Sequence, residues 1–166
     1  MTYLSTVDRL SEVEMTFRLA AYGVCLSDEG VLLVRDAPTS TWSLPGGGVE
    51  HGEDPFDTVI REIAEETGYE AVVERLLGVD SRVIPRESAW SGAEHQNVGV
   101  FYRVRVVGGE RRPEVNGATT EPAWVPIVDT GGLRRSSLVD VGLKLAATQP
   151  ATGHVETVPV GGLIQY

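Results

Sequence analysis

The pattern of hydrophobic and polar positions along the chain predicts a mixture of strands and helices. Residues 17–26 and 31–35 are β-type apolar runs joined by a Ser-Asp-Glu-Gly hairpin signal. Apolar residues also mark strands at 71–84, 98–107 and 123–128 and a short strand after the turn at 39–44. A C-terminal helix is expected at 134–147, whereas the glycine run at 45–48 and the polar segment 85–97 predict loops.

One further helix carries clear signals at both ends. Asp54 can cap its N-terminus, Pro55 suits the first helical position and Gly68 can end it in a left-handed conformation. Four apolar residues at i, i+3, i+4 and i+7 form a stripe that we expect to be buried: Phe56, Val59, Ile60 and Ile63.

These elements predict an α/β sandwich, with a mixed central sheet between helices. The chain has 166 residues, which is the size of one domain with a core of its own. We expect an N-terminal extension at 1–16, one domain at 17–149 and a C-terminal tail at 150–166. The tail is expected to pack on or beside the domain and to hold one short β-type segment at 155–160.

Composition narrows the class of protein. The formal net charge of −10 argues against a protein that binds the backbone of a nucleic-acid polymer. No apolar run is long enough for a membrane span, and the first residues lack the apolar segment of a secretory signal. The single cysteine, Cys25, lies in an apolar run and fits a buried, inert thiol in a reducing cytoplasm.

An acidic pattern on the 54–68 helix predicts metal binding. Glu62, Glu65 and Glu66 are at i, i+3 and i+4, so their side chains share one face within one turn, and we expect them to face outward beside the glycine run. Three like charges there destabilise an isolated helix, and a divalent cation would compensate them. Mg²⁺ suits such a face because it prefers carboxylate oxygens, retained waters and phosphates. A lone acidic cluster of this kind is more often a solvated surface, so the decision rests on its surroundings.

The surroundings complete a longer motif. From Gly47 to Tyr69 the chain reads G-x5-E-x7-R-E-(apolar)-x-E-E-x-G-(apolar), with every position filled. This resembles the Nudix box, and the chain is similar to MutT-like Nudix hydrolases. The lead-in Trp42-Ser43-Leu44-Pro45-Gly46 and the later Glu121-Pro122-Ala123-Trp124 also match the family's usual pattern. The resemblance covers about residues 17–147.

The resemblance implies a Nudix-type α/β/α sandwich and a metal-dependent pyrophosphohydrolase. Such an enzyme cleaves a nucleoside diphosphate linked to another moiety X by attack of water on a phosphorus. The implied cofactor is Mg²⁺, with Mn²⁺ as an alternative. The resemblance implies metal ligands at Glu62, Glu65 and Glu66, with Glu53 joining or supporting them and a glycine carbonyl at Gly46 or Gly47 in the metal shell. Arg61 is expected to hold the glutamates through salt bridges.

The general base is left open by the motif. Glu66 is one candidate, and an acid outside the helix is the other. Of the outside acids, Glu121 is favoured because it precedes the Trp124 strand, and Glu87 and Glu94 could swing in from the polar loop. Glu114 reads best as solvated surface.

The substrate is also left open. Trp90 could stack on a base, and four arginines at strands or strand ends could meet phosphate: Arg18, Arg35, Arg82 and Arg86. A nucleoside triphosphate, including an oxidised one, and ADP-ribose or a nucleotide sugar all fit. Pro85 is a weak hint towards ADP-ribose, whereas the compact layout favours triphosphates. The alternatives are a non-catalytic nucleotide sensor and a prenyl-diphosphate isomerase, and the protein is expected to be a monomer or a homodimer.

Overall fold

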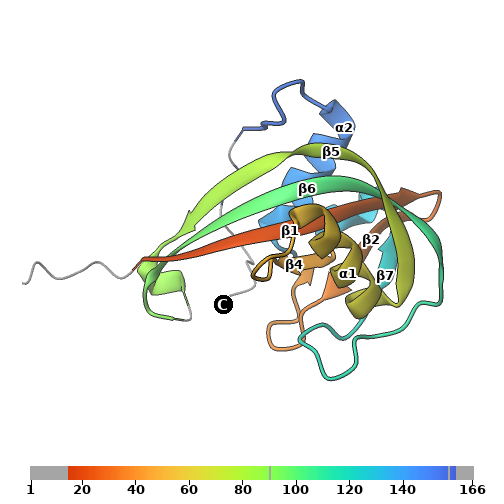
Figure 1. Cartoon of the computed structure of the whole chain (residues 1–166), viewed down its shortest axis with the longest axis horizontal. Coiled ribbons are helices and arrows are strands. Elements are labelled where there is room, and N and C mark those ends of the chain that lie inside the picture. The colour runs from red at the N-terminus through yellow and green to blue at the C-terminus, as the bar shows by residue number, and fades with distance from the viewer. Residues whose placement is uncertain (1–14, 90, 157, 160–166) are drawn as a thin grey trace, which may run out of the picture.

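The structure is a computed structural model that describes residues 15–89, 91–156 and 158–159 (Figure 1). The strands in the described part are β1 (Met15–Ser27), β2 (Gly30–Arg35), β3 (Trp42–Ser43), β4 (Gly46–Gly48), β5 (Tyr69–Ile84), β6 (Glu94–Gly109) and β7 (Ala123–Val125). The α-helices are α1 (Pro55–Thr67) and α2 (Ser137–Thr148), and the 3-10 helices are η1 (Arg86–Ser88) and η2 (Ile127–Gly132). No helix among these residues is long and apolar enough to cross a membrane.

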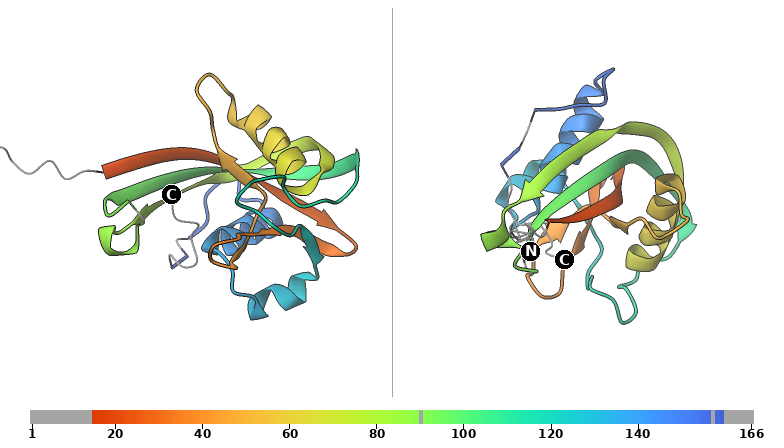
Figure 2. Two further views of the ribbon diagram at one scale, coloured as in Figure 1. Left: turned by 90° about the horizontal axis from the view of Figure 1, so that it is seen from below. Right: turned by 60° about the vertical axis from the view of Figure 1, so that its left-hand side comes forward.

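The strands form one mixed sheet in the order β3-β2-β1-β6-β5, with β4 paired to β1 and β7 paired to β2. β1 and β6 are parallel, and the other pairs are antiparallel. The helices α1 and α2 lie on opposite faces of this sheet (Figure 2). Val59 and Ile63 of α1 pack on one face, and Leu138 of α2 packs on the other. The predicted α/β/α sandwich with a mixed central sheet is therefore confirmed.

The three long strands β1, β5 and β6 extend together past α1 (Figure 1). β1 is central because it pairs with β6 along Met15–Cys25, with β4 at Ala20–Tyr22 and with β2 at its last residues. The expected hairpin between 17–26 and 31–35 is present, with Ser27 opposite Gly30.

Two expected loops are wrong in part. The glycine run is strand β4, because Gly46–Gly48 pairs with Ala20–Tyr22 of β1. The expected loop 85–97 ends early, because β6 already begins at Glu94 and pairs with β1 and β5 on its two sides. In both places the pairing partner is distant in sequence, and no local pattern reveals it.

The helical expectations need smaller corrections. α2 begins at Ser137, after an N-cap by Ser136, and the backbone of 134–136 instead hydrogen-bonds with Trp42. Phe56, expected in the buried stripe of α1, is exposed and meets only the edge of Tyr102, because the stripe outruns the sheet beneath it. The β-type segment expected at 155–160 shows no strand at its described residues 155, 156, 158 and 159, and its other two residues lie outside the described part.

Candidate functional site

Local signals set the position of α1, and with it the position of the acids. The Asp54 carboxylate accepts a hydrogen bond from the Phe56 N–H at 2.8 Å, as an N-cap does. At the other end Gly68 has φ 76°, and its N–H donates to the Ala64 carbonyl at 3.0 Å. Val59 and Ile63 are fully buried against the sheet. The adjoining side of the helix, which carries Glu62 and Glu66, faces the glycine strand β4.

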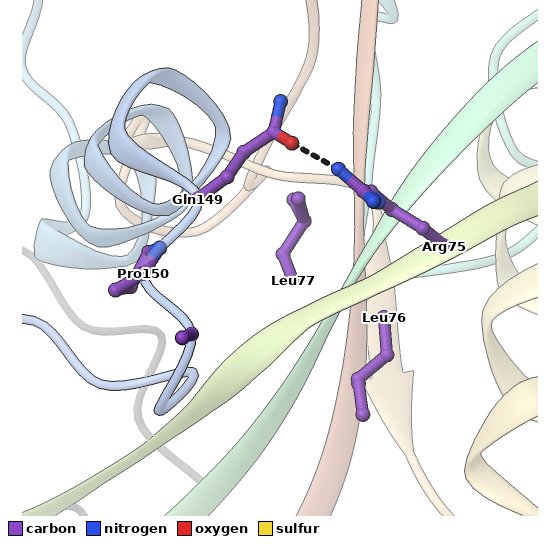
Figure 3. A pocket seen from close by; sticks show the side chains of 6 residues that line it. Arg75, Leu76, Leu77, Gln149 and Pro150 are labelled. Atoms are coloured by element: carbon purple, nitrogen blue, oxygen red, sulfur yellow. Dashed lines mark hydrogen bonds between the residues drawn. The ribbon is translucent and has the colours of Figure 1, made fainter.

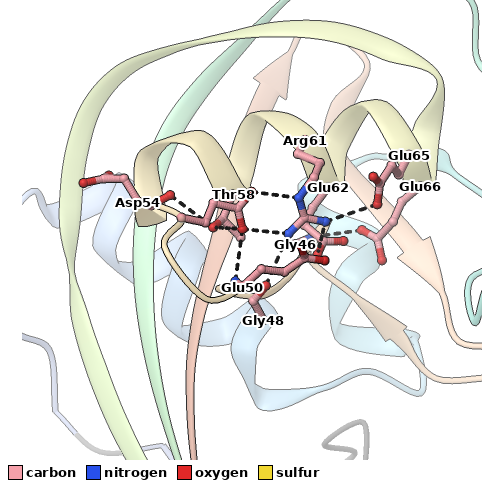
Figure 4. A network of polar contacts seen from close by, with 10 residues as sticks. Gly46, Gly48, Glu50, Asp54, Thr58, Arg61, Glu62, Glu65 and Glu66 are labelled. Carbon is pink, nitrogen blue, oxygen red and sulfur yellow. Dashed lines mark hydrogen bonds and ion pairs between the residues drawn. The ribbon is translucent and has the colours of Figure 1, made fainter.

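Arg61 is the centre of a dense ion-pair network (Figure 4). Its Nε and Nη2 donate to the two carboxylate oxygens of Glu53 at 2.8 and 2.9 Å. Its Nη1 donates to Glu62 at 2.9 Å and to Glu65 at 3.2 Å. Nη2 also reaches the Gly48 carbonyl at 3.3 Å, which ties α1 to β4. The salt bridges expected of Arg61 are present, and its fork geometry suits this two-point contact with Glu53.

Glu53 is held as an anion by these contacts. The Arg61 guanidinium lowers the pKa of the Glu53 carboxyl to about 2, and the Thr58 hydroxyl, which donates to the same carboxylate at 2.7 Å, adds to the effect. Glu53 therefore belongs structurally to the acidic face, although it lies before the helix.

Glu66 was expected to face outward and does not. It is only 7% exposed, and its Oε2 accepts a hydrogen bond from the Gly46 N–H at 2.9 Å. Burial raises the pKa of its carboxyl well above the usual range, the Gly46 N–H opposes this shift, and the charges of Glu62 and Glu114 add to it. The correction has a simple cause: β4 passes over this part of the helix, which the helical pattern alone does not show.

The other two acids differ in exposure. The Glu62 side chain is mostly buried, and burial raises the pKa of its carboxyl against the lowering effect of Arg61. Glu65 is the open member of the set, with 51% of its side chain exposed.

The glycine strand β4 allows this close approach. A Cβ added to Gly47 would lie 2.4 Å from Glu62 Oε1, a distance that real Cβ atoms do not show. A Cβ on Gly48 would lie 3.0 Å from Nε of Arg18, on the other side of the strand. A side chain at Gly47 would therefore displace the Glu62 carboxylate, and one at Gly48 would press on the Arg18 guanidinium.

The donor chemistry of this face fits a divalent cation. Glu62, Glu65 and Glu66 bring three carboxylates to one helix face, and burial raises the pKa of the Glu66 carboxyl well above its usual range. Within the described residues, no three acidic, histidine or cysteine side chains converge on a single metal position. The reason is visible in the network, because Arg61 draws Glu62 and Glu65 towards its own guanidinium.

The acids outside α1 that were considered as the general base differ in exposure and in their partners. Glu121 is largely exposed and pairs with Arg35 at 3.5 Å. Glu114, expected to be solvated, is partly buried, accepts hydrogen bonds from the backbone and hydroxyl of Thr119 at 3.0 and 2.9 Å, and contributes to the raised pKa of Glu66. No sequence signal singled out Glu114, because the long loop before β7 carries it back to the helix.

The other two candidates for the general base, Glu87 and Glu94, lie away from the acidic face. Glu87 is in η1 and Glu94 starts β6, at the end of the long strands away from α1 (Figures 1 and 2).

The arginines expected at substrate are not brought together. Arg82 is 5% exposed, with Nε paired to Asp80 at 2.6 Å and Nη1 hydrogen-bonded to the Ser137 hydroxyl. Arg86 is exposed in η1, and Arg35 pairs with Glu121. Trp90 lies outside the described residues. Arg18 is the arginine that the structure places beside the site, next to Gly48.

Two shallow hollows on the surface are separate from this site. One, of about 180 Å³, lies between β5 and the end of α2 and is lined by Arg75, Leu76, Leu77, Gln149, Pro150 and Ala151 (Figure 3). A neighbouring one of about 290 Å³ continues along β5 to Val79 and His154. Neither contains a residue of the acidic face.

The fold and this acidic face are those of a known class of proteins. A family model described as the NUDIX domain matches residues 16–139, well over half of the chain. The chain therefore belongs to the NUDIX domain family.

Individual relatives share parts of the chain. The MutT-like protein of Streptomyces ambofaciens is 33% identical over 104 residues, which make up 62% of this chain and 60% of that protein. Nudix hydrolase 25 of Arabidopsis thaliana is 36% identical over 110 residues, 60% of this chain and 63% of that protein. Across four curated relatives, the chain spans between 27% and 63% of the relative's own length.

Solved structures agree on the fold. The NUDIX hydrolase from Nitrosomonas europaea has a TM-score of 0.66 to this chain at 20% identity, covering 82% of this chain and 92% of that one. At this identity the likeness establishes the fold alone.

Proposed function

We propose that this protein is a Mg²⁺-dependent pyrophosphohydrolase that cleaves a nucleoside diphosphate linked to a moiety X. The observation that carries the proposal is the acidic face itself. Of the three carboxylates on α1, Glu62 and Glu65 pair with Arg61, and Glu66 accepts a hydrogen bond from the backbone of the glycine strand β4. Family membership supports the same reaction class.

Glu62, Glu65 and Glu66 would hold the Mg²⁺, or Mn²⁺ in its place. Glu53 would stay bound to Arg61 and support the set, and the backbone of Gly46 or Gly47 lies close enough to contribute a carbonyl. A divalent cation bound there would neutralise charge that develops on the phosphate oxygens. Arg61 keeps the like-charged acids in fixed places, and Arg18 adds a positive charge on the far side of β4.

Two acids remain as candidates for the general base, the group that takes a proton from the attacking water. Burial raises the pKa of the Glu66 carboxyl, which favours proton uptake by this group, but the carboxylate also accepts the Gly46 N–H. Glu114 lies close enough to influence Glu66 and is held by Thr119. Because Glu121 is exposed and paired with Arg35, it is the weaker candidate.

The structure weakens the isomerase alternative. Such chemistry would use a reactive cysteine, and Cys25 is 1% exposed, with burial raising the pKa of its thiol to about 12. The nucleotide-sensor alternative predicts binding without turnover.

A substrate panel separates the two readings. Nucleoside triphosphates, ADP-ribose, nucleotide sugars, dinucleoside polyphosphates and NADH should be incubated with Mg²⁺, with Mn²⁺ and with EDTA, and phosphate or nucleotide release measured. We expect turnover of at least one class that stops in EDTA. Nucleotide binding without turnover of any class would support the sensor instead. The expected cytoplasmic location and the monomer or homodimer state remain predictions.

A further inference from the structure

A buried row of polar side chains crosses three strands on the α2 side of the sheet. In the strand register Arg18 of β1 lies opposite Asn97 of β6, and Asn97 lies opposite Arg82 of β5. Directly paired residues place their side chains on the same face, within contact distance of each other. Asn97 is 4% exposed, and His95, two residues before it on the same strand face, is 5% exposed.

Two members of this row, Arg82 and Asn97, are held by the protein at one end and left open at the other. Arg82 binds Asp80 and Ser137 through Nε and Nη1, yet its buried Nη2 meets no hydrogen-bond acceptor among the described residues. Asn97 directs its Nδ2 towards the Tyr22 hydroxyl at 3.5 Å, and its buried Oδ1 meets no donor there.

His95 follows the same pattern. It bonds Thr16 through Nδ1 at 2.7 Å, and its buried Nε2 meets no partner in the described part.

Such open atoms are costly without a ligand. Leaving a buried donor or acceptor unpaired costs about 1–3 kcal/mol each. Three of them on one sheet face therefore indicate that a polar ligand group completes the hydrogen bonding. The pattern is not a general looseness of the core, since each of these side chains is fixed by a contact of its own.

The row is next to the acidic face. Ala20 of β1 is paired with Gly48 of β4. Arg18 precedes Ala20 by two residues on β1, a distance of about 7 Å. The Arg18 guanidinium reaches back to Gly48, and the charges of Glu62 and Glu66 act on it. A diphosphate held at the acids would therefore place the group attached to it over this row.

We propose that the row of Asn97 and Arg82 reads the base of the nucleotide and selects bases with a lactam edge, in which a ring N–H adjoins a carbonyl. Arg82 Nη2 can only donate, so it needs the carbonyl oxygen. Asn97 Oδ1 can only accept, so it needs the ring N–H. The proposal rests on the proposed function for the position of the phosphates.

The same chemistry rejects the other bases. Adenine and cytosine present an amino group where Arg82 needs an acceptor, so two donors would face each other. Guanine, hypoxanthine, uracil and thymine place the carbonyl and the N–H in the required order. The Arg82 guanidinium has donors only, so it rejects an amino group whichever way the Asn97 amide is turned.

The test compares matched nucleotides that differ in this edge. We expect kcat/KM to favour GTP over ATP, and UTP over CTP, by about 10- to 100-fold, the range of one good two-point base contact. In Asn97→Leu, which keeps the branched shape of the side chain and removes its polar atoms, the GTP-to-ATP ratio should fall to within about threefold. Asn97→Ala serves the same purpose if the larger leucine does not fit.

The control is Gln96→Leu on the same strand. Gln96 points to the opposite sheet face, where its amide donates to Ser81, so its change should leave the GTP-to-ATP ratio intact. Equal rates on GTP and ATP in the unaltered protein, or a ratio unchanged in both Asn97 variants, would overturn the proposal.

A binding experiment separates this idea from the proposed function. Calorimetry in Mg²⁺ with the α,β-methylene analogues of GDP and ADP, which cannot be hydrolysed, measures base selection without turnover. Tighter binding of the GDP analogue that is lost in Asn97→Leu supports base reading even in a protein that hydrolyses nothing. Hydrolysis of nucleotides together with equal binding of the two analogues leaves the proposed function standing and removes the base reading.

Discussion

Arg61 is the residue on which the arrangement of the acidic face depends. It contacts Glu53, Glu62 and Glu65 and the backbone of β4 at once. In the absence of metal it is the main counter-charge of the face. Removal of Arg61 should therefore disturb the positions of these acidic side chains more than the packing of the hydrophobic core.

The first prediction concerns Arg61→Ala in EDTA. Arg61 is the main cause that lowers the pKa of Glu53 to about 2, against about 4.5 when unfolded. A lowered carboxyl pKa stabilises the folded state above the unfolded value, and this stability is lost as the pH falls towards 2. We expect the variant to lose stability at pH 7 and to differ less from the unaltered protein at pH 3, as measured by urea unfolding.

The matched control is Arg105→Ala, which breaks an exposed pair with Glu74 and should change little at either pH. A loss in Arg61→Ala that is the same at pH 3 and pH 7 would show that the Glu53 pair does not carry the effect.

The second prediction concerns Glu66→Gln. We expect kcat to fall by about 10²- to 10⁴-fold, whether Glu66 acts as ligand or as base. Stability in EDTA should be kept or raised at pH 7. The raised pKa of Glu66 means that the unaltered protein loses stability as the pH rises above about 4.5, and glutamine removes that ionisation. Steady-state kinetics and urea unfolding check the two halves, and a variant with near-normal kcat would exclude Glu66 from the site.

At the scale of elements, the site is the junction between α1 and β4. The third prediction is that Gly47→Ala displaces the Glu62 carboxylate, because the new Cβ would lie 2.4 Å from Glu62 Oε1. A displacement of about 1 Å at a catalytic group can cost 10²-fold, so we expect a loss of that order in kcat/KM. Gly131→Ala is the control, since its Cβ would meet nothing within 4 Å. Equal activity of the two variants would show that the close approach at β4 is not needed.

The limits of α1 could be predicted from the sequence, because capping is a local property. Asp54, Pro55 and Gly68 act within a few residues of themselves, and the structure gives the helix those ends. Strand β4 could not be predicted, because its pairing with β1 joins segments more than twenty residues apart. The burial of Glu66 was missed for the same reason, since β4 is what covers it.

Polar residues inside strands were the other obstacle. His95 and Asn97 read as loop residues, yet pairing of β6 on both sides buries them in the sheet. A polar residue in a buried strand is unfavourable for folding alone, so a local pattern assigns it to the surface. Two of the residues with open hydrogen-bonding atoms, His95 and Asn97, are thus among those that sequence reasoning misplaced.

For the whole molecule, the net charge of −10 makes metal binding a matter of stability as well as chemistry. Part of that charge is the set of acids around Arg61, which one arginine does not neutralise. A cation that binds only the folded protein stabilises it by mass action.

The fourth prediction follows from this linkage. With Mg²⁺ at about 100 times its dissociation constant, the folded state should gain about 2.7 kcal/mol. For a domain of this size that corresponds to a rise in Tm of about 5–10 °C. Calorimetric scans with Mg²⁺, with EDTA and with NaCl at equal ionic strength distinguish binding from screening, since screening acts alike in both salts. Glu65→Gln combined with Glu66→Gln should abolish most of the Mg²⁺-specific rise, because two of the three proposed ligands lose their charge. A rise that NaCl reproduces, or that survives in the double variant, would place the cation elsewhere on this acidic surface and leave the α1 face without its proposed metal.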